Sequence, residues 1–146
     1  QVLPTLASRC RRITFSTLPR AQLKPLVSGL DSDEAQFLLH LSQGAPGTIQ
    51  LLKNNPERLR EEHQLASAAR AFWRETSMLT RMQLLAPLHE RDTASQQFLL
   101  HLALALRELP PGISLPSRTA FRRFLQGADT NVSRPLLCAE LAMTQE

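Results

Sequence analysis

Apolar residues recur at intervals of three and four along most of this sequence. That spacing places them on one side of an α-helix, so each run predicts a helix with one buried face. The longest run extends from Leu65 to Ala86 and predicts one long helix that Pro87 ends or kinks. Leucine and alanine are abundant, whereas the β-branched residues that favour strands are few. We therefore expect an all-α fold.

Prolines, glycines and capping residues divide residues 18–54 into three short helices. The predicted starts are Ser16–Pro19, Asp31–Glu34 and Pro46, and the predicted ends are Gly29, Gly44 and Asn54–Asn55. Pro25 should make the first helix short or irregular because proline lacks the amide hydrogen that a helix interior needs. Three helices in fewer than 40 residues predict a compact three-helix unit.

From Pro56 onward the apolar stripes become longer, and they predict a bundle of four helices over residues 55–146. After the first stripe, the expected helices start at Asp92–Thr93, surround Phe121–Leu125 up to Gly127, and run through Leu136 to Leu141. The Pro-Pro-Gly at residues 110–112 should break the chain between the second and third helices. Trp73 is expected either to anchor the core of this bundle or to lie in an interface.

The composition narrows the range of functions. A formal net charge of +4 suits a partner that carries phosphates but falls short of a dedicated nucleic-acid-binding domain. No apolar run approaches the roughly 20 residues that cross a bilayer, so we expect no membrane partner. Cys10, Cys138 and four scattered histidines match no zinc-site spacing. We expect a reduced, cytoplasmic protein with no metal and no cofactor.

The remaining polar residues predict structure rather than chemistry. His40 and His101 lie beside leucines and are expected to be satisfied histidines of the core or its flank. The charged residues near the start of the first long helix should form a solvated face: Glu57, Arg58, Arg60, Glu61 and Glu62. No arrangement resembles a hydrolase triad or a pair of acid–base carboxylates.

The first informative motif lies near the beginning of the sequence. Leu-Pro-Thr at residues 3–5 is followed by Ser8-Arg9-Cys10, then by Arg11 and Arg12. This string resembles the end of the ATPase core in clamp-loader subunits of the AAA+ superfamily. The resemblance implies that residues 1–17 close such a core and that Arg9 is an arginine finger, a planar and always-charged group presented to nucleotide on a neighbouring subunit. Otherwise Arg9 is a surface arginine in a basic turn.

The same resemblance assigns roles to the neighbours of Arg9. Ser8 would cap the local helix, and Cys10 would be packed rather than reactive. Arg11 and Arg12 would either approach primer-template phosphate or face water. Because the sequence starts without Met and inside the motif, we expect a C-terminal portion of a longer protein.

The second informative motif joins the second and third short helices. Ser42-Gln43-Gly44 is followed by Ala45-Pro46-Gly47, which resembles the lid motif of the same family. In the ATP-binding subunits the residue three after the glycine is usually an arginine that senses phosphates, whereas here it is Gly47. Without the resemblance, Gly44 simply ends one helix and Pro46 begins the next.

Together the two motifs, in this order and spacing, imply an architecture and a function. The resemblance implies a three-helix AAA+ lid at residues 18–54 and a helical collar domain at residues 55–146. It also implies a non-hydrolysing stator subunit that assembles with other clamp-loader subunits and acts indirectly on a sliding clamp and primer-template DNA. The alternatives are an ATP-hydrolysing clamp-loader subunit and a generic helical protein-interaction module.

Overall fold

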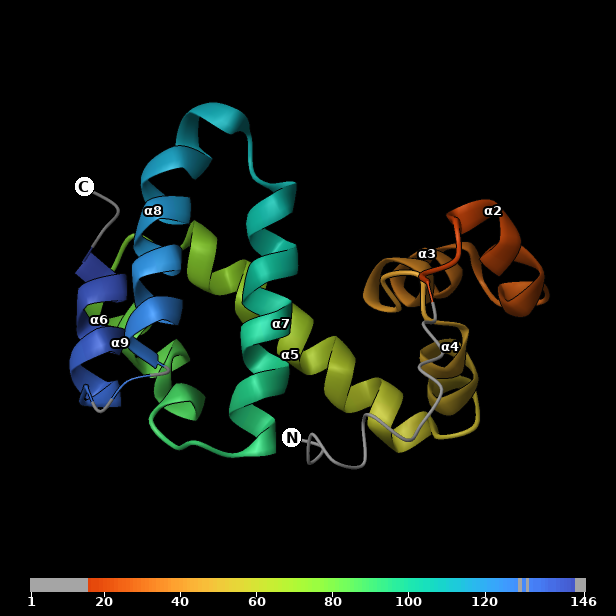
Figure 1. Ribbon diagram of the computed structural model, residues 1–146, viewed down its shortest axis with the longest axis horizontal. Helices are drawn as coiled ribbons and strands as arrows, with labels where there is room; N and C mark the ends of the chain where they lie inside the picture. The colour runs from red at the N-terminus through yellow and green to blue at the C-terminus, as the bar shows by residue number, and fades with distance from the viewer. Residues whose placement is uncertain (1–15, 129, 131, 144–146) are drawn as a thin grey trace, which may run out of the picture. The chain divides into compact units, whose positions relative to one another are not determined.

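The computed structural model describes residues 16–128, 130 and 132–143, with the backbone alone for residues 111–114. These described residues form α-helices and short 3-10 helices and contain no strand, which confirms the predicted all-α fold (Figure 1). The chain separates into two compact units between Pro56 and Glu57, and each is described by itself below. Of the predicted AAA+ remnant at residues 1–17, only Ser16 and Thr17 lie among the described residues.

The first unit contains the three short helical segments that the capping residues predict. They are α2 (Arg20–Leu23) continued by the 3-10 helix η1 (Lys24–Val27), α3 (Ser32–Leu41), and α4 (Pro46–Lys53). Pro25 lies in the 3-10 segment, so the expected irregularity of the first helix is confirmed. The Asp31 carboxylate accepts a hydrogen bond from the Asp33 amide at 3.1 Å, which caps α3 at its amino end.

The first unit buries one apolar side of each of its segments. η1 packs against α3 and α4, and α3 packs against α4. The buried apolar side chains are Leu23, Val27, Leu38, Leu41, Ile49 and Leu52. Lys53 Nζ donates a hydrogen bond to the Leu26 carbonyl at 2.7 Å, which ties the end of α4 to η1.

The second unit is a larger helical bundle. Its elements are α5 (Pro56–Arg74), α6 (Met78–Leu84), the 3-10 helix η2 (Ala86–Leu88), α7 (Thr93–Glu108), α8 (Pro111–Ala128) and α9 (Arg134–Met143). α8 packs against α7 and α9, while α6 packs against α9 (Figure 1). The large side chains of its core are Phe72, Trp73, Leu85, Leu88, Phe98, Leu102, Leu106, Phe121, Phe124, Leu137 and Leu141.

The prediction of one long helix through residue 86 is wrong, because the chain breaks between α5 and α6. The Glu75 carboxylate accepts hydrogen bonds from the amides of Thr76 and Ser77, each at 2.9 Å. The Ser77 hydroxyl then accepts from the Thr80 amide and caps α6. These side chains satisfy amides that would otherwise continue the helical ladder. Leu79, expected on the buried stripe, is 69% exposed as a result.

The third helix of the bundle is also longer than the sequence predicts. α8 begins at Pro111, within the expected break, and contains Pro116. A proline is well tolerated in the first turn of a helix, because no amide there has an intrahelical partner, so the Pro-Pro-Gly sequence starts this helix as well as ending α7. At the other end α8 continues one residue beyond Gly127, where an added Cβ would lie 2.7 Å from Leu137 Cδ2.

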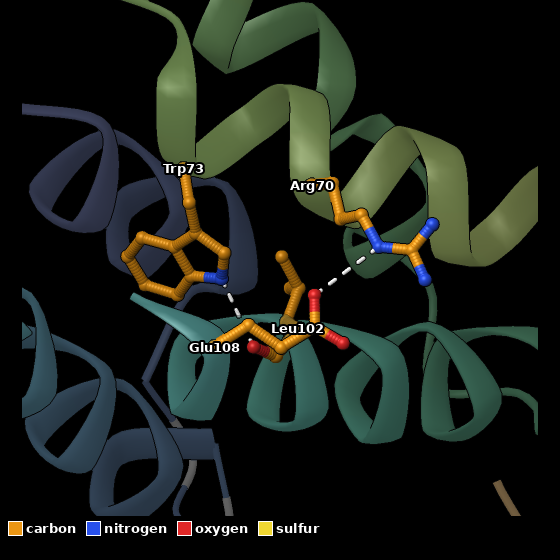
Figure 2. Close-up of polar contacts among 4 residues, drawn as sticks. All are labelled: Arg70, Trp73, Leu102 and Glu108. Atoms are coloured by element: carbon orange, nitrogen blue, oxygen red, sulfur yellow. Dashed lines mark hydrogen bonds and ion pairs between the residues drawn. The ribbon is translucent and has the colours of Figure 1, made fainter. Parts of the chain in front are cut away.

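Trp73 anchors the core and joins α5 to α7. Its side chain is 3% exposed, and its indole Nε1 donates a hydrogen bond to the Leu102 carbonyl at 2.9 Å (Figure 2). Nearby, Arg70 Nε lies 3.3 Å from Glu108 Oε2, also between α5 and α7 (Figure 2). Both members of this ion pair are 43% exposed, so it adds about 0–1 kcal/mol, and the indole supplies the stronger link.

Candidate functional site

The best-defined site among the described residues is the turn formed by the second sequence motif. α3 ends at Leu41, and Gln43 (φ 47°) and Gly44 (φ 91°) then adopt left-handed backbone conformations in succession. The Ala45 amide donates to the Ser42 carbonyl at 2.8 Å and closes the turn. Two left-handed residues in a row redirect the chain sharply, so that α4 can begin at Pro46.

Gly44 is required at this turn for a second reason, which is the close approach of another segment. The Leu18 amide donates a hydrogen bond to the Gly44 carbonyl at 2.8 Å. A Cβ added at Gly44 would lie 2.6 Å from the Thr17 Cβ and 3.0 Å from the Leu18 carbonyl oxygen. The segment that follows the Ser8-Arg9-Cys10 motif is therefore held at the glycine of the Ser42-Gln43-Gly44 motif.

Pro46 and Gly47 are both exposed in the first turn of α4. No heavy atom lies within 4 Å of the position that a Gly47 Cβ would take, so a longer side chain has room there. Glycine, however, offers no charge. The turn has the backbone shape of a helix-to-helix joint, and residue 47 supplies no cation to it.

The first motif lies outside the described residues, together with its proposed site residues Ser8, Arg9, Cys10, Arg11 and Arg12. The structure therefore describes Gly44, Pro46 and Gly47 and shows which segment approaches Gly44. The arginine-finger role of Arg9 remains a prediction from the sequence.

The first unit also has a shallow open pocket between η1 and α4. It is lined by Pro25, Leu26, Gln50, Lys53 and Asn54. The cation in this lining is engaged, because Lys53 Nζ donates to the Leu26 carbonyl. The lining contains no carboxylate, imidazole or thiol, so these residues supply neither a general base nor a nucleophile.

The second unit contains a buried hydrogen-bonded pair, Glu62 and His101, that contradicts one sequence prediction. Glu62, expected on a solvated face, is 8% exposed, and its Oε2 accepts a hydrogen bond from His101 Nε2 at 2.6 Å. The expectation of a satisfied core histidine is confirmed for His101, whose side chain is 2% exposed. The apolar spacing contains a signal for this pair, because Glu62 lies on the same stripe as Leu59, Ala66 and Ala69.

We expect Glu62→Ala to destabilise the second unit by about 1–3 kcal/mol, because His101 would remain buried without a partner for Nε2. Urea unfolding followed by the fluorescence of Trp73, the single tryptophan, measures this loss. The neighbouring exposed Glu61→Ala is the matched control and should change stability by less than about 0.5 kcal/mol. Equal stabilities of the two variants would contradict the role assigned to the Glu62–His101 pair.

Arg81 is a buried cation whose position the apolar pattern did not indicate. Its guanidinium carbon lies 4.7 Å from the centre of the Phe72 ring, and Nη2 donates to the Leu141 carbonyl at 3.1 Å. Burial lowers the pKa of Arg81 from its usual value. The charge lies against the carboxyl end of α9, where the helix dipole favours a cation. This arrangement stabilises the packing of α6 on α9 and offers no access to a substrate.

Neither a metal-binding cluster nor a reactive thiol is present among the described residues. Within them no cluster of three or more His, Cys, Asp and Glu side chains can hold a metal ion. Burial raises the pKa of the Cys138 thiol to about 11, so this cysteine stays protonated and unreactive at neutral pH. In the described part of the chain, no helix is both long enough and apolar enough to cross a membrane.

Comparison with known proteins does not assign the chain to a family: no protein-family model, curated protein or solved structure matches it.

Proposed function

We propose that this chain is the lid and collar portion of the delta-prime subunit of the bacterial DNA polymerase III clamp loader. In this role it is a stator: it hydrolyses no ATP, presents Arg9 to the nucleotide of a neighbouring ATPase subunit, and joins a ring of subunits through its C-terminal helices. It thereby contributes to loading a sliding clamp onto primer-template DNA during replication.

One structural observation supports the proposal in addition to the sequence resemblance. The two motifs that resemble clamp-loader subunits lie far apart in the sequence, yet the segment after the first is hydrogen bonded to the second, from the Leu18 amide to the Gly44 carbonyl. The 2.6 Å separation between an added Gly44 Cβ and the Thr17 Cβ means that this contact demands glycine. Such a contact suits a stator, because a finger that acts on a neighbouring subunit needs a fixed base.

Gly47 favours a stator over the alternative of an ATP-hydrolysing clamp-loader subunit. The position is exposed and has space for a long side chain, so packing does not explain the glycine. A subunit that sensed its own γ-phosphate would need a cation there. The absence of charge at residue 47 leaves Arg9, which acts on another subunit, as the phosphate-directed group of the proposal.

The outward side of α9 supplies a surface for assembly. Leu136 and Met143 are seven residues apart, so they lie on the same side of the helix, and they are 66% and 55% exposed. Large apolar side chains on an outer helix face favour contact with another protein. This observation also suits the second candidate function, a generic helical interaction module.

We expect the subunit to form a stable complex with clamp-loader ATPase subunits. Full-length delta-prime carrying this chain would be mixed with those subunits, and the mass of the product measured by size-exclusion chromatography with light scattering. Leu136→Glu with Met143→Glu should weaken assembly by at least about tenfold, because two charges would be desolvated in the interface. Leu115→Glu, equally apolar and 69% exposed on α8, is the control and should assemble normally.

One outcome would contradict the proposal, and another would exclude only the interface assigned to α9. A subunit that remains monomeric beside the ATPase subunits at micromolar concentration would exclude the clamp-loader assignment. If Leu115→Glu weakened assembly and the α9 double variant did not, the clamp-loader assignment would stand, but α9 would be excluded as the interface.

A further inference from the structure

The outward side of α8 carries three arginines and no carboxylate. Arg118, Arg122 and Arg123 are all exposed, whereas Phe121 and Phe124 on the opposite side of the helix are buried in the core. Arg118 and Arg122 are four residues apart, so they lie on the same side, separated by a rise of about 6 Å along the helix. Arg123 lies at the other edge of the exposed face.

These three charges are not neutralised by their surroundings. The sequence of α8, Pro111–Ala128, contains no Asp or Glu. The Arg70–Glu108 ion pair and the Glu62–His101 hydrogen bond of this unit involve no α8 arginine. Residues 57–146 carry eleven arginines and ten acidic residues, so the unit is nearly neutral and its positive charge is concentrated on this helix.

The structure distinguishes between the classes of anionic partner. A helix that lies on an anionic membrane inserts its apolar side into the lipid. The apolar side of α8 is already occupied, because Phe121 and Phe124 are 5% and 2% exposed in the bundle core. What remains outside are the three guanidinium groups, each of which can bind two oxygens of one phosphate, together with the exposed side chains of Leu115 and Leu125. Arg118 and Arg122 follow one another along the helix, and such a pair suits a polymer with regularly spaced phosphates.

We propose that the outward side of α8 binds the phosphodiester backbone of a nucleic acid strand through Arg118, Arg122 and Arg123. Contacts of this kind read no base and are therefore independent of nucleotide sequence. The proposal depends on the charges of α8 alone and holds whether or not the chain belongs to a clamp loader.

The test is binding of the 146-residue chain to a fluorescently labelled oligothymidylate, followed by anisotropy at several NaCl concentrations. Each phosphate contact with a single strand contributes about 0.7 to the slope of log K against log salt. Arg118→Gln with Arg122→Gln should therefore reduce that slope by about 1.4 and weaken binding at low salt by about tenfold or more. Trp73 fluorescence verifies that the variant is folded.

A charge-matched variant separates this surface from net charge. Arg60 and Arg74 are exposed on α5, and Arg60→Gln with Arg74→Gln removes the same two charges. This control should retain the salt slope of the unmodified chain. Equal losses in the two double variants would overturn the proposal, as would undetectable binding of the unmodified chain at 50 mM NaCl.

Two further probes distinguish the other anionic partners. Polyglutamate should compete with the oligonucleotide only weakly, and vesicles containing phosphatidylserine should not bind the chain through α8. If polyglutamate displaced the oligonucleotide at equal charge concentration, or if vesicle binding were lost in the α8 double variant, the surface would recognise a different anion and the proposal would be wrong.

Discussion

Arg9→Ala in the full-length subunit should leave clamp-loader assembly intact while ATP turnover and clamp loading fall together. An arginine supplied across an interface stabilises the charge on the phosphoryl group in transit, and in well-studied systems its contribution is about 10³–10⁵ in rate. The nucleotide site that Arg9 is proposed to complete should show a loss of this order. If the nucleotide sites act independently, the total ATP turnover of the complex should fall by the fraction that this one site contributes. If each loading cycle needs every site, the total turnover should fall by more than that fraction. Clamp-stimulated ATPase and clamp-loading assays on the purified complex measure both quantities.

Variants at Arg9 and its neighbours test the mechanism behind this loss. Arg9→Lys should restore little activity, because a compact ammonium cannot reproduce the two parallel hydrogen bonds of a guanidinium. Arg11→Ala and Arg12→Ala are controls for local positive charge, and they should leave ATP turnover unchanged if those side chains face water. Normal clamp loading by Arg9→Ala in an assembled complex would mean that Arg9 is a surface arginine.

The helices of the first unit could be predicted from the sequence because their boundaries depend on local signals. Asp31 caps α3 through its own side chain, Gly44 takes the left-handed conformation that ends the turn, and Pro46 begins α4. Each of these effects acts over a few residues, so a single sequence contains it. The close contact between Gly44 and Thr17 is different, because it depends on how two separated segments pack.

The errors in the second unit come from interactions that periodicity does not encode. The apolar spacing continues past residue 74, but the Glu75 carboxylate binds the next two amides and interrupts the helix. The partner of Glu62 is His101, which lies 39 residues away in another helix. The charge of Glu62 predicted a solvent-exposed side chain, whereas its position on the apolar stripe predicted a buried one. The side chain is buried, so the position predicted its environment better than the charge did.

The candidate site is predictable only in part for the same reason. The Ser42–Gly47 motif could be recognised from its letters, and its turn follows from the glycine and proline that it contains. The segment after Arg9 is held at this turn by the hydrogen bond between Leu18 and Gly44. This contact joins two separated segments, so no local sequence signal predicts it. The position of Arg9 itself remains a prediction, since it lies outside the described residues.

Gly44→Ala should destabilise the first unit by about 2–5 kcal/mol. A left-handed backbone costs an alanine about 1–2 kcal/mol relative to glycine, and relieving a 2.6 Å contact with the Thr17 Cβ adds about 1–3 kcal/mol as the neighbouring segment shifts. Local opening should therefore become about 30-fold to 5,000-fold more frequent. Native-state hydrogen exchange of the Leu18 amide and of the amides in α3 and α4 measures the change directly.

Alanine substitutions at two other glycines of the same unit distinguish the cost of the left-handed backbone from the cost of the steric contact at Gly44. Gly29 has φ 87° with no heavy atom within 4 Å of an added Cβ, so Gly29→Ala should show the backbone strain alone, about 1–2 kcal/mol. Gly47 is helical and equally unobstructed, so Gly47→Ala should be neutral or stabilise α4 by up to about 1 kcal/mol. If Gly44→Ala cost no more than Gly29→Ala, the segment after the Arg9 motif would not be held against this turn. The base proposed for the arginine finger would then be lost, whatever the assembly experiment showed.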